Sequence, residues 1–262
     1  MVENEQGLRV EPPVTDAPVD SEVAELNGPE QGVMVIGDLI LAPTVTGEAG
    51  WMRHVLLLVL LAGSPVSGEV LRYEIGPRES QLVVVLRRGG IASGLAHDHA
   101  VEATRFRGVV HCDPRRIGSG RIELRVDARS LVPDRGVLRQ QFGLEGEIDA
   151  GDRAKILKTL HGPDQLDTQR YPSMTFVSTR VEGRADGRWV VFGEWSIRGV
   201  TRKVECSLTV TCTPERFEAI GTLRFRQSSF GYRPYRIFLG AVQVRDEAVL
   251  HLRIRATRSS RK

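Results

Sequence analysis

RIELRVDAR, residues Arg121–Arg129, alternates apolar and charged side chains without interruption. Successive side chains of a β-strand point to opposite faces, so Ile122, Leu124 and Val126 share one face and the charged residues share the other. A strand of this kind is buried on one side and solvated on the other. The stretch therefore predicts a strand that borders an apolar interior.

The same period of two recurs along most of the chain. It is clearest at 189–197, 204–212, 217–225 and 250–256. Short polar links between such segments, for example EGRADG at 182–187, suit β-hairpins. We predict eight or nine strands, near 71–76, 80–88, 99–112, 119–130, 172–182, 188–198, 202–213, 216–227 and 245–256.

One segment has a different period. Ile148–Leu160 places Ile156, Leu157 and Leu160 at helical spacing, and the HGP sequence that follows stops a helix. A sheet of eight or nine strands with one apolar face either packs on another sheet or closes on itself. Because only one helix is available to cover it, we predict an all-β fold with one helix: a closed antiparallel barrel of about eight strands.

The apolar run VLLLVLLA, residues 55–62, is too short to span a bilayer as a helix. It follows a basic residue and precedes small residues, which is the pattern of a secretory signal peptide over residues 52–68. Such a peptide starts at a methionine, and Met52 is at the right place. We therefore expect a periplasmic or secreted protein with no transmembrane span in its mature form.

Residues 1–51 then lie upstream of the signal peptide. They carry ten of the 33 acidic residues, and we interpret them either as an extension from a start site placed too early or as a disordered acidic tail. The expected barrel domain covers 69–257, and 258–262 form a short tail. Basic residues of that domain are scattered along alternating positions, which favours solvated faces over a nucleic-acid site.

The chain has three cysteines, Cys112, Cys206 and Cys212. Their spacing matches neither a disulfide framework nor a zinc motif. Cys206 and Cys212 lie six residues apart on one expected strand, about 20 Å, which is too far for a bond between them. Cys112 could pair with one of them, but buried free thiols are the simpler interpretation.

Four short motifs follow one another along the chain: YEI at 73–75, YPSMTFVST at 171–179, GEWSIRGVTRKV at 193–204 and QSSFG at 227–231. In order and spacing they resemble the motifs of the YceI-like proteins over about 71–256. The resemblance implies an extended lipocalin-like barrel, a tunnel that binds a polyisoprenoid or similar amphiphile, export to the periplasm and a possible homodimer. The Gly-rich segment GGIASGLAHDH before the third strand is longer than the family's turn.

Small and aromatic residues alternate on the expected inward faces. Gly193, Gly221, Ala219 and Ala128 lie among large side chains and would leave a channel that a slender ligand could fill. The alternative is that the large side chains are ordinary core. The candidate ligand-binding residues of the barrel wall are Phe176, Trp189, Trp195, Phe217, Leu223 and Phe225.

Two polar clusters flank these strands. His97 and His99 would point the same way on a strand and could share a metal, although no third ligand has suitable spacing. They could instead meet a ligand head group at the barrel mouth, or be solvated. Arg226 and Tyr232 belong to a second cluster that could hold an anionic head group, or form a solvated rim.

The sequence contains no GxSxG, P-loop, GxGxxG or HExxH motif, so we expect a binding protein and no enzyme. The favoured function is a periplasmic carrier of a polyisoprenoid lipid, with a bound isoprenoid or quinone and no other cofactor. One alternative is a metal-binding protein or enzyme centred on His97 and His99. Another is an interaction barrel with a solid core.

Overall fold

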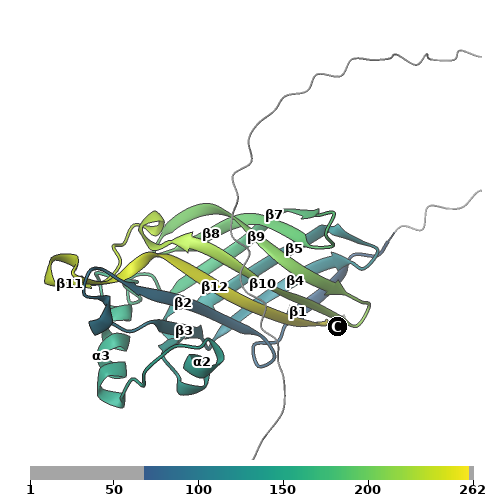
Figure 1. Ribbon diagram of the computed structural model, residues 1–262. Coiled ribbons are helices and arrows are strands. Elements are labelled where there is room, and N and C mark those ends of the chain that lie inside the picture. The colour runs from purple at the N-terminus through teal and green to yellow at the C-terminus, as the bar shows by residue number, and fades with distance from the viewer. Residues whose placement is uncertain (1–67, 260–262) are drawn as a thin grey trace, which may run out of the picture. The chain divides into compact units, whose positions relative to one another are not determined.

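A computed structural model describes residues 68–259 (Figure 1). The upstream segment 1–51, residues 52–67 of the expected signal peptide and residues 260–262 lie outside the described part of the chain. The described residues include the whole expected barrel domain, 69–257, so this domain can be compared with the structure.

The fold is a closed antiparallel barrel of eight strands, as the alternating pattern predicted. Each neighbouring pair is antiparallel, and pairing of the first strand with the last completes the ring. Around the ring the strands are β1 (Leu71–Ile75), β4 (Phe106–Asp113), β5 (Arg116–Asp127), β7 (Ser173–Gly183), β8 (Trp189–Ile197), β9 (Val200–Cys212), β10 (Arg216–Arg226) and β12 (Val242–Arg258).

Three further strands extend the barrel at one end. They are β2 (Gln81–Gly89), β3 (His99–Ala103) and β6 (Leu131–Pro133), in that order from the free edge of β12. The long strand β12 pairs with β1 near Ala256 and with β2 from Gln243 to Arg253, so β1 and β2 follow each other along one edge. The wall therefore continues past the closed ring.

The prediction of one continuous strand over 99–112 is wrong, because the structure has two strands there. The chain breaks at Thr104 and Arg105, and the two halves take different partners: β3 pairs with β2 and β6, whereas β4 pairs with β1 and β5. Thr104 anchors the break, because its Oγ1 donates to the Ser130 carbonyl at 2.8 Å. The bend separates the ring from its extension.

The stretch that predicted the fold lies in β5 and has the expected orientation. Arg121, Glu123 and Arg125 are exposed, whereas Ile122, Leu124 and Val126 line the barrel interior. These three inward residues are nevertheless only half-buried. A close-packed core buries such residues fully, so the interior of the barrel contains open space.

Helix α3 (Ala150–His161) agrees with the expected helix to within two residues. Asp149 caps it by accepting from the Asp152 amide at 2.8 Å. At the other end, His161 Nε2 donates to the Leu131 carbonyl at 3.1 Å, which fixes the helix beside the free edge of β6. The helix therefore lies at the extended end of the barrel (Figure 1).

A second helix, α2 (Gly136–Gln141), was not expected from the sequence. Leu138 of this helix packs against Val83, Val85 and Ala100, which form a small core on the outer face of the extension. Short 3-10 turns η1 (Ser93–Leu95), η2 (Ala128–Ser130), η3 (Gln227–Phe230) and η4 (Phe238–Gly240), and the two-residue strand β11 (Arg236–Ile237), complete the described chain.

The boundaries of two expected elements move slightly. The sequence predicts Ala128 on the inward face of a strand, but in the structure it begins the turn η2 after β5 has ended. Strand β12 continues through Arg258, the first residue of the expected tail, and the Ser259 amide donates to the Arg72 carbonyl at 2.8 Å.

Candidate ligand cavity

The ring and the three strands of its extension together surround an inner cavity of about 120 Å³. Its wall is almost entirely apolar and comes from strands on all sides of the barrel. Trp195 projects into it from β8. The candidates Phe176, Phe217 and Leu223 also line it.

An outer cavity of about 230 Å³ lies at the extended end, between the strand extension and helix α3. Ile156 and Leu160 of the helix form part of its wall. The two cavities adjoin each other, because the same five side chains line both of them: Val84, Val101, Leu131, Met174 and Trp195. We refer to the two adjoining cavities together as the hollow.

An aromatic cluster forms one wall of the hollow where the cavities meet. The rings of Trp195 and Phe225 lie 4.8 Å apart at 73°, and Trp195 and Phe230 lie 5.3 Å apart at 68°. Edge-to-face geometry of this kind is favourable for aromatic pairs and holds the rings in place. The wall is therefore rigid and apolar.

Polar groups enter the hollow at the outer cavity. They are His99, Lys155, Thr159, Gln165, Gln227, Tyr232 and Tyr235. Burial raises the pKa of Tyr232 well above its usual value, so this phenol stays neutral. Gln227 is already engaged, because its Nε2 donates to the Arg245 carbonyl at 2.8 Å. The hollow is thus apolar along its length and polar at one end.

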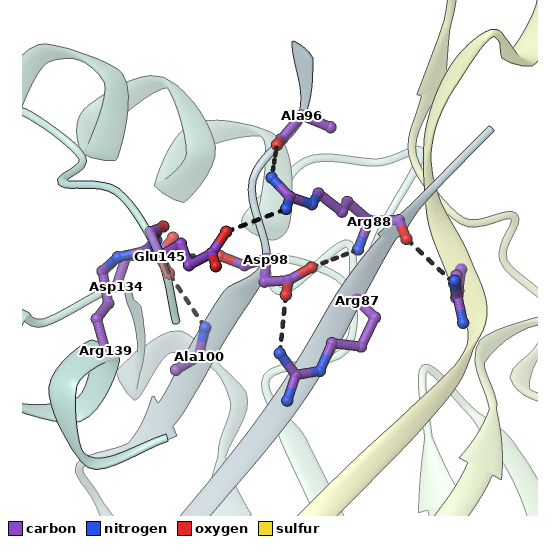
Figure 2. Close-up of polar contacts among 9 residues, drawn as sticks. Arg87, Arg88, Ala96, Asp98, Ala100, Asp134, Arg139 and Glu145 are labelled. Atoms are coloured by element: carbon purple, nitrogen blue, oxygen red, sulfur yellow. Dashed lines mark hydrogen bonds and ion pairs between the residues drawn. The ribbon is translucent and has the colours of Figure 1, made fainter. Parts of the chain in front are cut away.

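His99 is held by a buried carboxylate. Its Nδ1 lies 2.7 Å from Oδ2 of Asp134, whose side chain is fully buried. In Figure 2 Asp134 lies between Ala100 and Arg139, and its Oδ1 accepts from the Ala100 amide at 3.0 Å and from Arg139 Nη1 at 3.1 Å. When the neutral ring donates Nδ1–H to Asp134, Nε2 is left as an acceptor for a ligand.

His97 and Asp98 do not join this arrangement. His97 is exposed and does not line either cavity. Burial alone would raise the pKa of Asp98, but the Arg88 amide and the Arg87 guanidinium, at 2.7 and 2.8 Å, hold it below its usual value (Figure 2). Within residues 68–259 no group of three or more His, Cys, Asp or Glu side chains could hold a metal ion.

Two other candidates lie away from the hollow. Trp189 has the correct parity on β8 but packs near Gly183 and Gly118 at the hairpin end of the strand. Arg226 is exposed on the rim. Neither residue lines a cavity.

The expectation that small residues open the channel is wrong for the two glycines. A Cβ on Gly193 would lie 2.5 Å from the ring of Phe176, and one on Gly221 would lie 2.7 Å from Leu208 Cδ2. These neighbours fill the space that the glycines leave. Ala219, in contrast, does line the inner cavity.

Sequence reasoning missed several residues of the outer cavity. Lys155 and Gln165 come from helix α3 and the segment after it, which the sequence could not place relative to the barrel. Asp134 lies in the sequence PDRG, which indicates only a turn. The αL backbone of Asp134, with φ of 55°, turns its carboxylate toward His99.

The opposite end of the barrel is closed by side chains. The Tyr73 hydroxyl donates to the Thr213 carbonyl at 2.6 Å, and the Cys212 thiol donates to the same hydroxyl at 3.5 Å. The ring of Phe217 lies 6.3 Å from that of Tyr73. All three cysteines are free thiols.

The comparisons with known proteins agree with this architecture. A family model for the YceI-like domain matches residues 73–256. The chain belongs to the YceI-like family. The YceI-like barrel is a binding-protein fold, and the resemblance of the four sequence motifs is thereby confirmed. A search of curated proteins finds no significant match.

Two solved structures illustrate what this YceI-like chain is similar to at low sequence identity, and the first of them shares its fold. The BcnA protein of Burkholderia cenocepacia is 20% identical with a TM-score of 0.55, and the match covers 70% of this chain and 99% of that one. The YCEI protein of Campylobacter jejuni is 14% identical with a TM-score of 0.46, over 61% of this chain and 85% of that one. Among the described residues no helix has the length and hydropathy of a membrane span.

Proposed function

We propose that this YceI-like protein binds a polyisoprenoid or a similar long amphiphile, such as a prenylated quinone, inside the barrel. The observation that carries the proposal is the pair of adjoining cavities, of which the inner one is apolar and the outer one has polar groups in its wall. Its two ends match the two ends of such a molecule. We also propose that the protein is exported to the periplasm and acts as a carrier without catalysing a reaction.

The inner cavity suits the tail. A cavity of about 150 Å³ with an apolar lining stays free of water and can hold a benzene-sized molecule. The inner and outer cavities, of about 120 and 230 Å³, together exceed that size. Each methylene that leaves water for such a wall contributes about 0.8 kcal/mol, so a few isoprene units offset the cost of ordering a flexible chain.

The outer cavity suits a polar head. Asp134 orients His99 so that its second ring nitrogen is free to accept from a hydroxyl, as in a quinol. Lys155 and Tyr235 at the same cavity add donors for a carbonyl or phosphate oxygen. These three groups converge from β3, helix α3 and the segment before β11, which favours one bound orientation.

The test is to block the inner cavity and measure the ligand. Ala219→Phe adds a ring to the wall of the inner cavity, whereas Ile220→Phe adds the same ring on the outer face of β10, because neighbouring strand residues point to opposite sides. Both proteins, purified from the native host, are compared with the wild type by native mass spectrometry and organic extraction. They are also titrated with a polyprenyl alcohol and a prenylated benzoquinone.

The proposal expects a stoichiometric amphiphile in the wild type and in Ile220→Phe, and its loss from Ala219→Phe. It also expects Ala219→Phe to stay folded, since the new ring occupies space that is empty without a ligand. An extract of the wild type without any amphiphile, combined with no binding of either probe, would contradict it. Equal binding by both variants would place the ligand elsewhere and contradict it as well.

A further inference from the structure

Two loops at the extended end of the barrel expose large apolar side chains. Ile91 is 98% exposed and Leu95 79%, on the segment between β2 and β3. Phe238 is 75% exposed and Leu239 108%, in the turn η4 before β12. Single exposed apolar residues are ordinary, but four on neighbouring loops form a patch that needs an explanation.

The two loops are joined to each other. The Ala92 amide donates to the Ala241 carbonyl at 2.8 Å. Gly90 packs so closely on the second loop that a Cβ there would lie 2.7 Å from the Gly240 carbonyl oxygen. We call residues 90–98 and 233–241 the mouth loops, because Tyr235 of the second one lines the outer cavity.

The backbone of the second mouth loop is strained in a way that exposes its apolar residues. Phe238 has φ of 50° and Leu239 has φ of 55°. Bulky side chains avoid this left-handed region, and two such residues in succession persist only where something holds them there. A fold that optimised only its own stability would place glycine or asparagine at these positions.

The surroundings of the patch are basic. Residues 87–98 and 233–246 contain five arginines and two aspartates. Arg87 is paired with Asp98 (Figure 2). Within the described part of the chain, Arg233 and Arg236 have no ion-pair partner, and both are exposed. The patch therefore carries cationic charge that is not neutralised by neighbouring acids.

The base of the first mouth loop is fixed by a polar network. Arg88 donates to the Ala96 carbonyl and to Glu145, each at 3.3 Å (Figure 2). Arg245 Nε donates to the Arg88 carbonyl at 3.1 Å. Asp98 closes the network through the Arg88 amide. The loop is thus held at its base while its apolar side chains point outward into solvent.

We propose that the mouth loops dock on an anionic lipid surface. Apolar side chains close in sequence to unpaired arginines are a combination that inserts into the headgroup region, where the guanidinium groups meet lipid phosphates. Each arginine near an anionic surface raises the partition coefficient roughly fivefold at low salt. Docking would bring the outer cavity to the bilayer, and it does not depend on which molecule the cavity holds.

The test is flotation with vesicles of phosphatidylcholine alone and of phosphatidylcholine with phosphatidylglycerol. Phe238→Asn/Leu239→Asn removes two inserted side chains, and asparagine tolerates the left-handed backbone, so this variant is expected to be at least as stable as the wild type. It should lose at least about tenfold in partitioning. The matched control is Ile220→Thr, an exposed residue on the body of the barrel, which should bind like the wild type.

The double variant Arg233→Gln/Arg236→Gln tests the contribution of positive charge to vesicle binding. This variant should lose the preference for phosphatidylglycerol and the salt sensitivity of binding, while weak partitioning to phosphatidylcholine remains. Wild-type protein that fails to float with anionic vesicles overturns the proposal. So does equal flotation of the asparagine variant. If size exclusion shows instead that the mouth loops hold two copies together and vesicles do not bind, the patch is a dimer surface and the proposal is wrong.

Discussion

Asp134→Asn is the substitution with the largest expected effect outside the apolar interior. Asp134 is fully buried and accepts from three donors: the His99 ring, the Ala100 amide and Arg139. Arg139 is itself only 4% exposed. Asparagine keeps the size of the side chain and tolerates the left-handed backbone, so the substitution removes the charge with little change in shape.

The magnitude follows from the contacts that remain. Removing one partner of a buried ion pair costs about 3–5 kcal/mol. Arg139 keeps its bonds to the carbonyl oxygens of Asp98 and Gly146, at 2.7 and 3.0 Å, so the lower end of that range applies. We expect a loss of about 3 kcal/mol in the free energy of unfolding. In a domain of this size that lowers Tm by about 6–12 °C.

The assay is thermal and urea unfolding of the wild type and Asp134→Asn, followed by circular dichroism. The urea midpoint should fall while the slope of the unfolding free energy against urea stays unchanged. Asp98→Asn is the control, because that carboxylate is partly exposed and its loss should cost about 1 kcal/mol. If the free energy of unfolding of Asp134→Asn lies within about 0.5 kcal/mol of the wild-type value, Asp134 does not anchor His99 and Arg139 as we argue.

Three further predictions follow from individual side chains. Burial raises the pKa of Cys112, and it raises the pKa of Cys206 to about 12. We therefore expect that neither thiol is alkylated in the folded protein at about pH 8, whereas both react in denaturant. Rapid labelling of the folded protein would contradict this. The pKa of His251 is lowered, first by burial and then by two nearby arginines, so folding disfavours protonation of its ring. The wild type should therefore lose stability relative to His251→Gln as pH falls below about 6.5. Parallel profiles of unfolding free energy against pH for the two proteins would refute this. Gly193→Ala should cost about 1–3 kcal/mol because the new methyl group would meet the Phe176 ring, and an unchanged urea midpoint would show that the ring moves aside freely.

The barrel could be predicted because each of its long strands has one solvent-exposed face and one apolar face. In β5 the exposed Arg121 and Arg125 alternate with Ile122 and Leu124, and this alternation depends on local sequence alone. The break at Thr104 and Arg105 could not be predicted, because the residues on both sides still alternate as a strand. Which neighbours each half pairs with depends on segments far away in the sequence.

The candidate site could be predicted in part for the same reason. Parity along a strand tells which face a residue occupies, and Trp195 and Phe217 do face the hollow. Parity does not tell how far along the barrel axis a residue lies, so it also selects Trp189, which lies at the hairpin end of β8. A glycine likewise suggests open space, but at Gly193 a neighbouring ring fills it.

Strand β12 has a consequence for how the protein is made. It forms the seam between β10 and the edge of β1 and β2, and all of these partners precede it in the sequence. Until residues 242–258 are available, the edges of β10, β1 and β2 that β12 covers stay unpaired, and open strand edges are prone to edge-to-edge association. Closure of the barrel therefore has to wait for its last strand, and β12 joins two sheets that are otherwise separate.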